Sequence, residues 1–255
     1  MKTESTKWFE VLSLLLESEI VPNAIHRVLL YGPPGTGKSS APWRARQGEG
    51  VTRVTLTPAM PVEELTGCWQ LRATDGGTDT VWQDGPAIVA MRTGAILVLD
   101  EVDRRSPDVE PLLHQLLDDR AMLRVTLPTG EVVEAADGFA VFATTNATPD
   151  DLPAALKDRF GISLLCDLPA PGILDAVPEG LRNMTTAHME EQGRSAAEYC
   201  PTPTARTALA WVRLTAALDD CSSFDGDAQE YAARLIYGKR ADDVLSVIGT
   251  ASVNS

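Results

Sequence analysis

The segment LLYGPPGTGKSS, Leu29–Ser40, joins an apolar run to a glycine-rich loop. Within it, Gly32–Ser39 fits the phosphate-loop pattern G-x-x-x-x-G-K-[ST]. The glycines let the backbone turn until its N–H groups point at phosphate oxygens, an approach that a Cβ would block. The lysine of such a loop reaches the β- and γ-phosphates, and the hydroxyl that follows it binds Mg²⁺. The segment therefore predicts a nucleotide site built from a contiguous set of residues: Gly32, Pro33, Pro34, Gly35, Thr36, Gly37, Lys38, Ser39 and Ser40.

The residues that follow the loop, APWRARQGEG, interrupt the helix that a phosphate loop normally opens. A helix that begins near Gly37 meets Pro42 at about its fifth residue, where proline removes one hydrogen bond and can bend the helix. The phosphate loop itself uses N–H groups that precede residue 42. We therefore predict a short or kinked helix that ends before Gly48, and an intact phosphate site.

Apolar stretches separated by helical patterns indicate the fold class. Most of these runs are largely apolar, as expected for strands buried on both faces of a parallel sheet, whereas residues 51–58 alternate and end at Pro58. The alternation of strands and helices predicts a parallel sheet in a layered α/β domain. Together with the phosphate loop, this leads us to expect the three-layer α/β/α core of a P-loop NTPase. The stretches that we assign to strands are residues 26–32, 51–58, 94–103, 139–146 and 162–168.

Other patterns divide the rest of the chain. Ser106 predicts the cap of a helix with apolar residues on one face, and residues 122–135 predict a β-hairpin that turns at residues 128–130. Beyond about residue 170 strands give way to helical periodicity. We predict a nucleotide-binding core followed by a small all-α lid domain. Their bounds are 1–169 for the core, with an N-terminal helix in 1–22 and a hairpin insertion in 120–137, and 170–255 for the lid.

Composition narrows the class of protein further. The chain has 255 residues and a formal net charge of −14, which disfavours nonspecific binding to nucleic acid. No apolar run approaches the roughly 20 residues of a membrane span. The cysteines form no C-x-x-C pair, a pattern typical of reduced thiols in a cytoplasmic protein.

An acidic pair completes the predicted chemistry. Asp100 and Glu101 end an apolar run about 60 residues after the phosphate loop, a separation that makes the pair informative. Ligands of parallel α/β sheets bind at the carboxyl ends of the strands, where this pair should lie. We expect Asp100 to hold Mg²⁺ through water and Glu101 to activate the water that attacks the γ-phosphate.

With these motifs in order, residues 20–215 resemble the AAA+ ATPases, and most of all the MoxR-like group. That group includes relatives of midasin and of cobalt-chelatase and NorQ/CbbQ-type subunits. The resemblance rests on YGPPGTGKSS, LVLDEVDR, FATTN, ALKDRF and TPTAR. It implies that Asn146 is the sensor-1 residue that orients water, that Arg159 is an arginine finger reaching a neighbouring subunit, and that Arg206 is a sensor-2 arginine. The plainer alternatives are an asparagine that caps a turn and surface arginines, with Arg159 paired to Asp158.

The resemblance implies an ATP- and Mg²⁺-dependent homo-oligomer, a hexameric ring that remodels or activates a partner protein. The partner could carry a von Willebrand A-type domain, and the process could be insertion of a metal cofactor. Two alternatives stay open: an ATP-binding assembly switch with slow turnover, and a DNA-directed motor or helicase loader, which the acidic charge disfavours. Residues 60–85 match a region that carries an insert in this group, and we expect Trp69 and Trp82 to pack in the core rather than on a partner surface.

Overall fold

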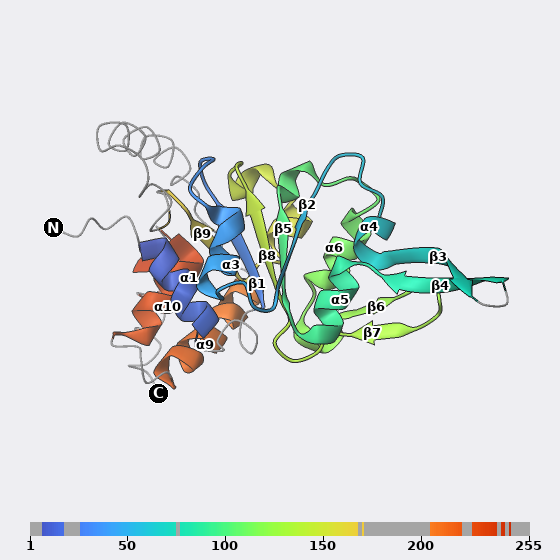
Figure 1. The fold of residues 1–255 in the computed structure, drawn as a ribbon. Helices are drawn as coiled ribbons and strands as arrows, with labels where there is room; N and C mark the ends of the chain where they lie inside the picture. The colour runs from blue at the N-terminus through green and yellow to red at the C-terminus, as the bar shows by residue number, and fades with distance from the viewer. Residues whose placement is uncertain are drawn as a thin grey trace.

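The computed structural model describes residues 7–17, 26–74, 77–167, 170, 205–220, 226–238, 241, 242 and 245. At its centre lies a five-stranded sheet in the order β2-β5-β8-β1-β9 (Figure 1). Every neighbouring pair in this sheet is parallel. All five predicted strands are confirmed, each somewhat shorter than its apolar stretch: β1 (Arg27–Tyr31), β2 (Val51–Thr55), β5 (Ile96–Asp100), β8 (Ala140–Thr145) and β9 (Ile162–Leu165).

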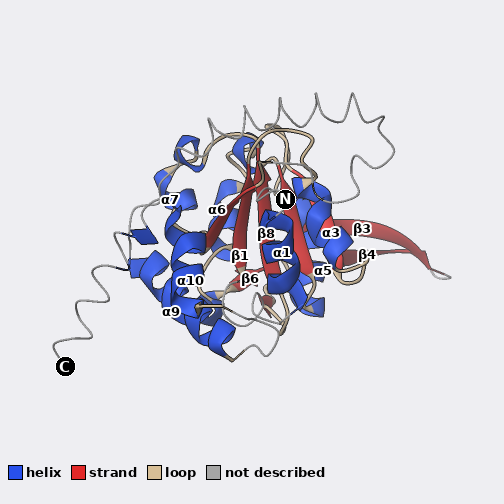
Figure 2. Cartoon of the chain, turned by 90° about the vertical axis from the view of Figure 1, so that its left-hand side faces the viewer, coloured by secondary structure: helices blue, strands red, loops and turns tan. Residues whose placement is uncertain are grey.

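Helices cover both faces of the sheet, which confirms the three-layer prediction (Figures 1 and 2). Successive strand residues point to opposite faces, so each strand contributes to two separate apolar clusters. Leu30 and Phe142 pack on the side of α1 (Lys7–Glu17), while Leu29 and Val141 pack on the other side. The first cluster also contains α9 (Ala205–Asp219) and α10 (Ala228–Tyr237), and the second contains α5 (Pro86–Thr93) and α6 (Glu110–Leu116).

The described C-terminal helices share an apolar core with the sheet. Leu214 of α9 and Ile236 of α10 belong to the same buried cluster as β1 and α1. The helical periodicity of this region is therefore confirmed where α9 and α10 are described. The predicted boundary between residues 169 and 170 adjoins a stretch outside the described residues, and the division into core and lid stays a prediction.

The segment after the phosphate loop forms two short pieces instead of one helix. A 3₁₀ turn, η2 (Lys38–Ser40), leads into α3 (Ala41–Ala45). Pro42 lies in the first turn of α3, where its missing N–H costs no helical hydrogen bond. The prediction of a short helix that ends before Gly48 is confirmed. The proline is accommodated by a change of helix type rather than by a bend.

Two hairpins extend the molecule beyond the sheet (Figure 1). One, β6 (Arg124–Thr126) and β7 (Val132–Glu134), is the predicted hairpin and packs its inward residues against α6. The other, β3 (Gly67–Thr74) and β4 (Gly77–Asp84), follows the short helix α4 (Glu63–Thr66) and was not foreseen.

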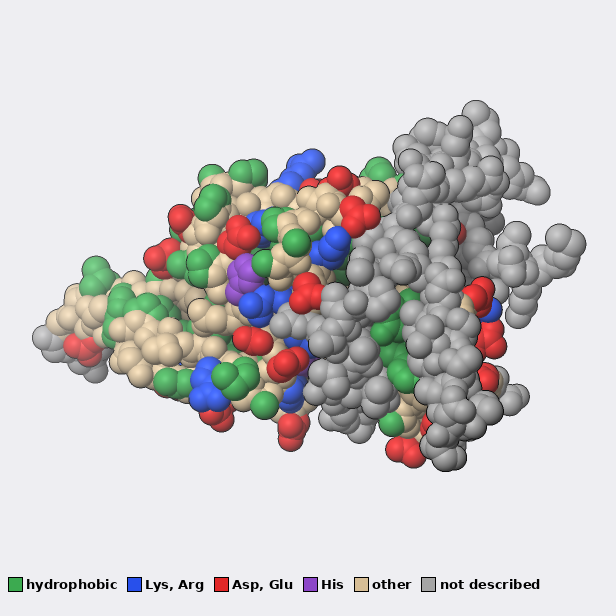
Figure 3. Space-filling model, turned by 180° about the vertical axis from the view of Figure 1, so that it is seen from behind, with side chains coloured by type: hydrophobic (Ala, Val, Ile, Leu, Met, Phe, Trp, Pro, Cys, Tyr) green, Lys and Arg blue, Asp and Glu red, His purple; other side chains and the backbone are tan. Residues whose placement is uncertain are grey.

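Trp69 corrects our expectation of core packing on the β3–β4 hairpin, because its side chain is 53% exposed. It meets Trp82 edge to face at 5.5 Å between ring centroids, and Trp82 is the half-buried member of the pair. Figure 3 shows hydrophobic side chains exposed on this projecting arm. The arm reaches too far from the sheet for its outer residues to be covered.

A second correction concerns the start of α6. Ser106 was predicted to cap this helix, but α6 begins at Glu110 and its N-cap position is Val109. The Ser106 hydroxyl instead donates to the Met60 carbonyl at 2.6 Å and ties two buried loops together. Short elements complete the described fold: η3 (Val102–Arg104), η4 (Arg120–Met122), η5 (Pro149–Asp151) and α7 (Ala154–Lys157). None of the helices in the described ranges is long and apolar enough to cross a bilayer.

Candidate functional site: a phosphate-loop cavity

The phosphate loop leaves β1 at its carboxyl end and needs glycine for steric reasons. Gly32 has a φ of 137°, and a Cβ at this position would lie 2.6 Å from the Cys166 carbonyl oxygen. Gly35 and Gly37 also have positive φ values, 83° and 90°. Residues that carry a side chain rarely adopt such backbone angles, so the turn depends on these glycines. At Gly32 the loop lies close to the Cys166 carbonyl, which directly follows β9.

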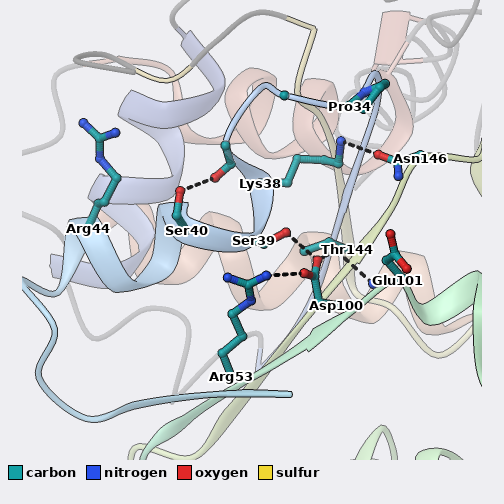
Figure 4. Close-up of a pocket in the computed structure, with 12 residues that line it drawn as sticks. Pro34, Lys38, Ser39, Ser40, Arg44, Arg53, Asp100, Glu101, Thr144 and Asn146 are labelled. Atoms are coloured by element: carbon teal, nitrogen blue, oxygen red, sulfur yellow. Dashed lines mark hydrogen bonds and ion pairs between the residues drawn. The ribbon is translucent and has the colours of Figure 1, made fainter. Parts of the chain in front are cut away.

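A cavity of about 600 Å³ opens beside the loop (Figure 4). It lies where β1, β5 and β8 end, the edge at which parallel α/β sheets bind ligands. Most of the predicted site residues meet here. The lining consists of Pro34, Gly35, Gly37, Lys38, Ser39, Ser40, Arg44, Arg53, Asp100, Glu101, Thr144 and Asn146.

Lys38 is buried, and its ammonium has three acceptors. It donates to the carbonyls of Gly32 and Pro33 at 2.8 and 2.7 Å and to Asn146 Oδ1 at 3.1 Å. Burial lowers the pKa of Lys38 below its ordinary value. The contact with Asn146 joins the phosphate loop to the end of β8, as Figure 4 shows.

Asp100 is the centre of a second network. Its Oδ1 accepts hydrogen bonds from the hydroxyls of Ser39 and Thr144, and its Oδ2 lies 2.7 Å from Nη2 of Arg53. Burial alone would raise the pKa of Asp100, but these hydrogen bonds outweigh it and lower the pKa. The carboxylate is therefore held as an anion beside a hydroxyl.

The residues present fit a nucleotide with Mg²⁺. The cation takes oxygen ligands and retains several waters, and the Ser39 hydroxyl and Asp100 carboxylate lie within hydrogen-bonding reach of each other at the cavity wall. The loop glycines keep Cβ atoms away from the space where phosphates would bind. Ser39 and Asp100 are thus the residues that would hold the metal.

Glu101 has an unusual backbone and a partly open side chain. Its φ and ψ of 58° and 51° lie in the left-handed region, which a non-glycine residue adopts at some energetic cost. The Glu101 N–H donates to Thr144 Oγ1 at 3.2 Å. Its carboxylate lies 3.4 Å from Nη1 of Arg104 and remains 32% exposed. The strained backbone thus places this carboxylate at the cavity, next to Asp100.

Among the predicted site residues, Arg159 lies away from this cavity, and Gly32, Pro33 and Thr36 are not among its lining residues. Arg159 donates from Nη1 to the His114 carbonyl at 2.9 Å and lies 3.7 Å from Asp118, so it contacts the end of α6. Arg159 therefore forms its ion pair with Asp118. The plainer alternative in the sequence analysis had paired it with Asp158. Arg206 belongs to α9 by its backbone, but its side chain lies outside the described residues.

Sequence reasoning missed three lining residues, Arg44, Arg53 and Thr144. Thr144 stands in the FATTN stretch that drew attention only for its final Asn146. The available signal was that Thr144 lies in a buried strand next to β5, the strand that ends at Asp100. Arg53 lies on an edge strand, and nothing in the spacing of the sequence pairs it with Asp100.

The chain is similar to several known proteins. Residues 27–160 match the AAA domain of the dynein-related subfamily. The chain is 39% identical over 150 residues to protein NorQ of Paracoccus denitrificans, covering 56% of this chain and 53% of that one. It is 36% identical over 155 residues to an uncharacterised protein of Staphylococcus haemolyticus, covering 58% of each chain. The chain thus spans little more than half the length of these relatives.

The fold also matches a solved structure. A crystal structure of a candidate ATPase from Cytophaga hutchinsonii superposes with a TM-score of 0.61 over 96% of this chain and 88% of that chain, at 16% sequence identity. The similarity confirms the P-loop α/β fold. The family match over residues 27–160 shows that the chain belongs to the AAA family, in the dynein-related, MoxR-like branch.

Proposed function

We propose that this protein hydrolyses ATP in a Mg²⁺-dependent reaction and uses the energy to remodel or activate a partner protein. One observation carries the proposal. A single cavity brings the phosphate-loop residues Lys38 and Ser39 together with Asp100, Glu101 and Asn146. These are the residue types that phosphoryl transfer requires: donors for phosphate, ligands for a metal and a base for water.

Each residue has a distinct role in this proposal. The loop N–H groups and Lys38 bind the β- and γ-phosphates, and Ser39 and Asp100 hold Mg²⁺, which neutralises charge on the phosphates. Glu101 takes a proton from the attacking water, and Asn146 orients that water. Because Lys38 already contacts Asn146 at 3.1 Å, the two residues are close enough to act on the same phosphate.

The partner and the assembly rest on the resemblance to MoxR-like proteins. We propose a homo-oligomeric ring, hexameric by analogy. In this ring Arg159 reaches the nucleotide site of the adjacent subunit, and Arg206 contacts the γ-phosphate from the lid. The partner class that the resemblance implies is a protein with a von Willebrand A-type domain. The net charge of −14 favours a protein partner over nucleic acid.

Steady-state ATP hydrolysis by wild type and Glu101→Gln tests the catalytic part. The variant keeps the shape of the side chain but removes the base, so we expect turnover to fall by about 100-fold or more. Binding of a fluorescent ATP analogue should stay within about threefold of wild type, because the phosphate contacts come from other residues. Glu49→Gln is a matched control, since Glu49 is exposed and does not line the cavity.

The same measurement separates an assembly switch from an enzyme. Oε2 of Glu101 lies 3.4 Å from Nη1 of Arg104, an ion pair that would compete with the attacking water for the carboxylate if it persisted with ATP bound. Wild-type turnover no faster than that of Glu101→Gln, with ATP-dependent oligomers still forming, would contradict the enzyme and support the switch.

A further inference from the structure

The contact between Arg53 and Asp100 has no role in the proposed reaction, although it lies in the middle of the site. Arg53 extends from β2, and its Nη2 is 2.7 Å from Asp100 Oδ2. The Arg53 side chain is 52% exposed, whereas that of Asp100 is 9% exposed. Figure 4 shows the guanidinium directed into the cavity toward the carboxylate.

Both carboxylate oxygens of Asp100 accept hydrogen bonds. Oδ1 accepts from Ser39 and Thr144, and Oδ2 accepts from Arg53. A Mg²⁺ ion beside Ser39 needs a lone pair of this carboxylate, either directly or through a bound water. It would also meet the positive charge of Arg53 a few ångströms away, and like charges repel. Arg53 and the metal therefore compete for the same anion.

Arg53 is the member of this pair that can move. Asp100 ends a central strand and is held by two hydroxyl donors. Arg53 lies on β2, an edge strand, and half of its side chain is in solvent. A long side chain of this kind can leave its partner without disturbing the core.

We propose that Arg53 is an internal counter-ion that occupies Asp100 in the nucleotide-free site and is displaced when nucleotide and Mg²⁺ bind. Arg53 thus sets the Mg²⁺ concentration that nucleotide binding requires. The inference rests on the proposed nucleotide site, but it concerns binding and not turnover.

The test is the Mg²⁺ dependence of binding of a fluorescent ADP analogue, which undergoes no hydrolysis. The dissociation constant is measured in EDTA and across a Mg²⁺ series for wild type, Arg53→Gln and Arg53→Lys. We expect Arg53→Gln to lower the half-saturating Mg²⁺ concentration by about fivefold, the effect of a partly exposed ion pair. Its dissociation constant in EDTA should stay within about twofold of wild type. Arg53→Lys keeps the charge and should stay near wild type.

Arg44→Gln is the matched control. Arg44 lines the same cavity, and Figure 4 draws its side chain pointing away from Asp100. This variant removes the same charge from the cavity and should leave the Mg²⁺ midpoint near the wild-type value. Thermal unfolding in EDTA checks that each variant is folded, and Arg53→Met provides a second neutral side chain should Arg53→Gln be unstable.

Two results would overturn the inference while leaving the nucleotide site standing. One is an unchanged Mg²⁺ midpoint in both neutral Arg53 variants. The other is an equal drop in Arg44→Gln, which would mean that total charge in the cavity matters and the Asp100 contact does not. Failure of wild type to bind the analogue at any Mg²⁺ concentration would be a different result, because it would overturn the proposed function itself.

Discussion

At the scale of single residues, the carboxyl end of α6 shows how buried polar groups are satisfied. His26 Nε2 lies 2.8 Å from the Asp118 carbonyl, and Arg27 donates to the Leu117 carbonyl at 2.9 Å. Arg159 bonds the His114 carbonyl in the same turn region. Helix ends leave such carbonyls without internal partners, and basic side chains are favourable there. Because a carbonyl only accepts, the neutral His26 ring must carry its proton on Nε2.

His26 predicts a pH dependence of stability. Burial, helped by the charge of Arg27, lowers the pKa of His26 from 6.5 to about 4. The unfolded chain therefore binds a proton near pH 6.5 that the folded chain resists until about pH 4. The free energy of unfolding should be unaffected by this group above pH 6.5 and should fall by up to about 3 kcal/mol as the pH drops to 4. Urea unfolding at a series of pH values measures this loss.

His26→Gln should make the stability less sensitive to acid over that range, because glutamine can still donate to the Asp118 carbonyl but does not titrate. His114→Gln is the control, because it replaces a histidine that lies outside the His26–Asp118 contact. Parallel curves for wild type and His26→Gln between pH 6.5 and 4 would show that His26 is not the group responsible.

The same scale shows what the sequence could and could not predict about the site. The loop glycines, Lys38 and the acidic pair were predictable because their chemistry depends on local spacing along the chain. The Asp100–Arg53 ion pair was not, because it joins neighbouring strands through a side chain on the sheet edge. Whether the predicted residues act as proposed stays a question for the kinetic tests.

At the scale of elements, Arg92 ties the two hairpins to α5. Its Nε lies 2.8 Å from an Asp84 carboxylate oxygen, and its Nη1 and Nη2 bond Glu131 at 2.7 and 2.8 Å. Asp84 ends β4, and Glu131 lies in the turn between β6 and β7. The exposed guanidinium of Arg92 thus joins both hairpins to α5, by a bidentate pair with Glu131 and an ion pair with Asp84.

We expect Arg92→Ala to loosen the β6–β7 hairpin without unfolding the sheet. Amide hydrogen exchange in residues 124–134 should become several-fold faster, because the turn loses its tie while the apolar residues stay buried. Exchange in β1 and β8 should not change. Arg124→Ala is the control, since the hydrogen bond of the Arg124 side chain within the described residues goes to the Ala121 carbonyl in η4 and does not join the hairpin to α5. Equal exchange in wild type and Arg92→Ala would show that the hairpin does not depend on this tie.

Elements also differ in how far they could be predicted. Buried strands such as β5 and β8 are mostly apolar, and a run of apolar residues can be recognised in the sequence. The β3–β4 hairpin lacks it because most of its residues are exposed on both faces. Pairing there comes from the backbone ladder and the Trp69–Trp82 contact, which a scan for core-facing alternation does not detect.

At the scale of the whole molecule, we propose that Arg159 acts across the interface between two subunits of the ring. The cavity already contains Lys38 and Glu101, whereas the side chain of Arg159 contacts the end of α6 and does not line the cavity. If Arg159 acts in catalysis, it must therefore act on a neighbouring copy. An arginine supplied in trans neutralises charge on the transferred phosphoryl group.

Mixing two inactive variants tests this arrangement. Arg159→Ala keeps an intact cavity and lacks the finger, while Lys38→Ala lacks the phosphate contact and keeps the finger. In a one-to-one mixed ring, about a quarter of the interfaces should pair an intact cavity with an intact Arg159 from the neighbour. ATP hydrolysis by the mixture should then exceed the average of the two separate variants. Native mass spectrometry confirms that the rings contain both variants. No gain in activity from such mixed rings would rule out a finger role for Arg159, because every other residue of the cavity would be present in one subunit.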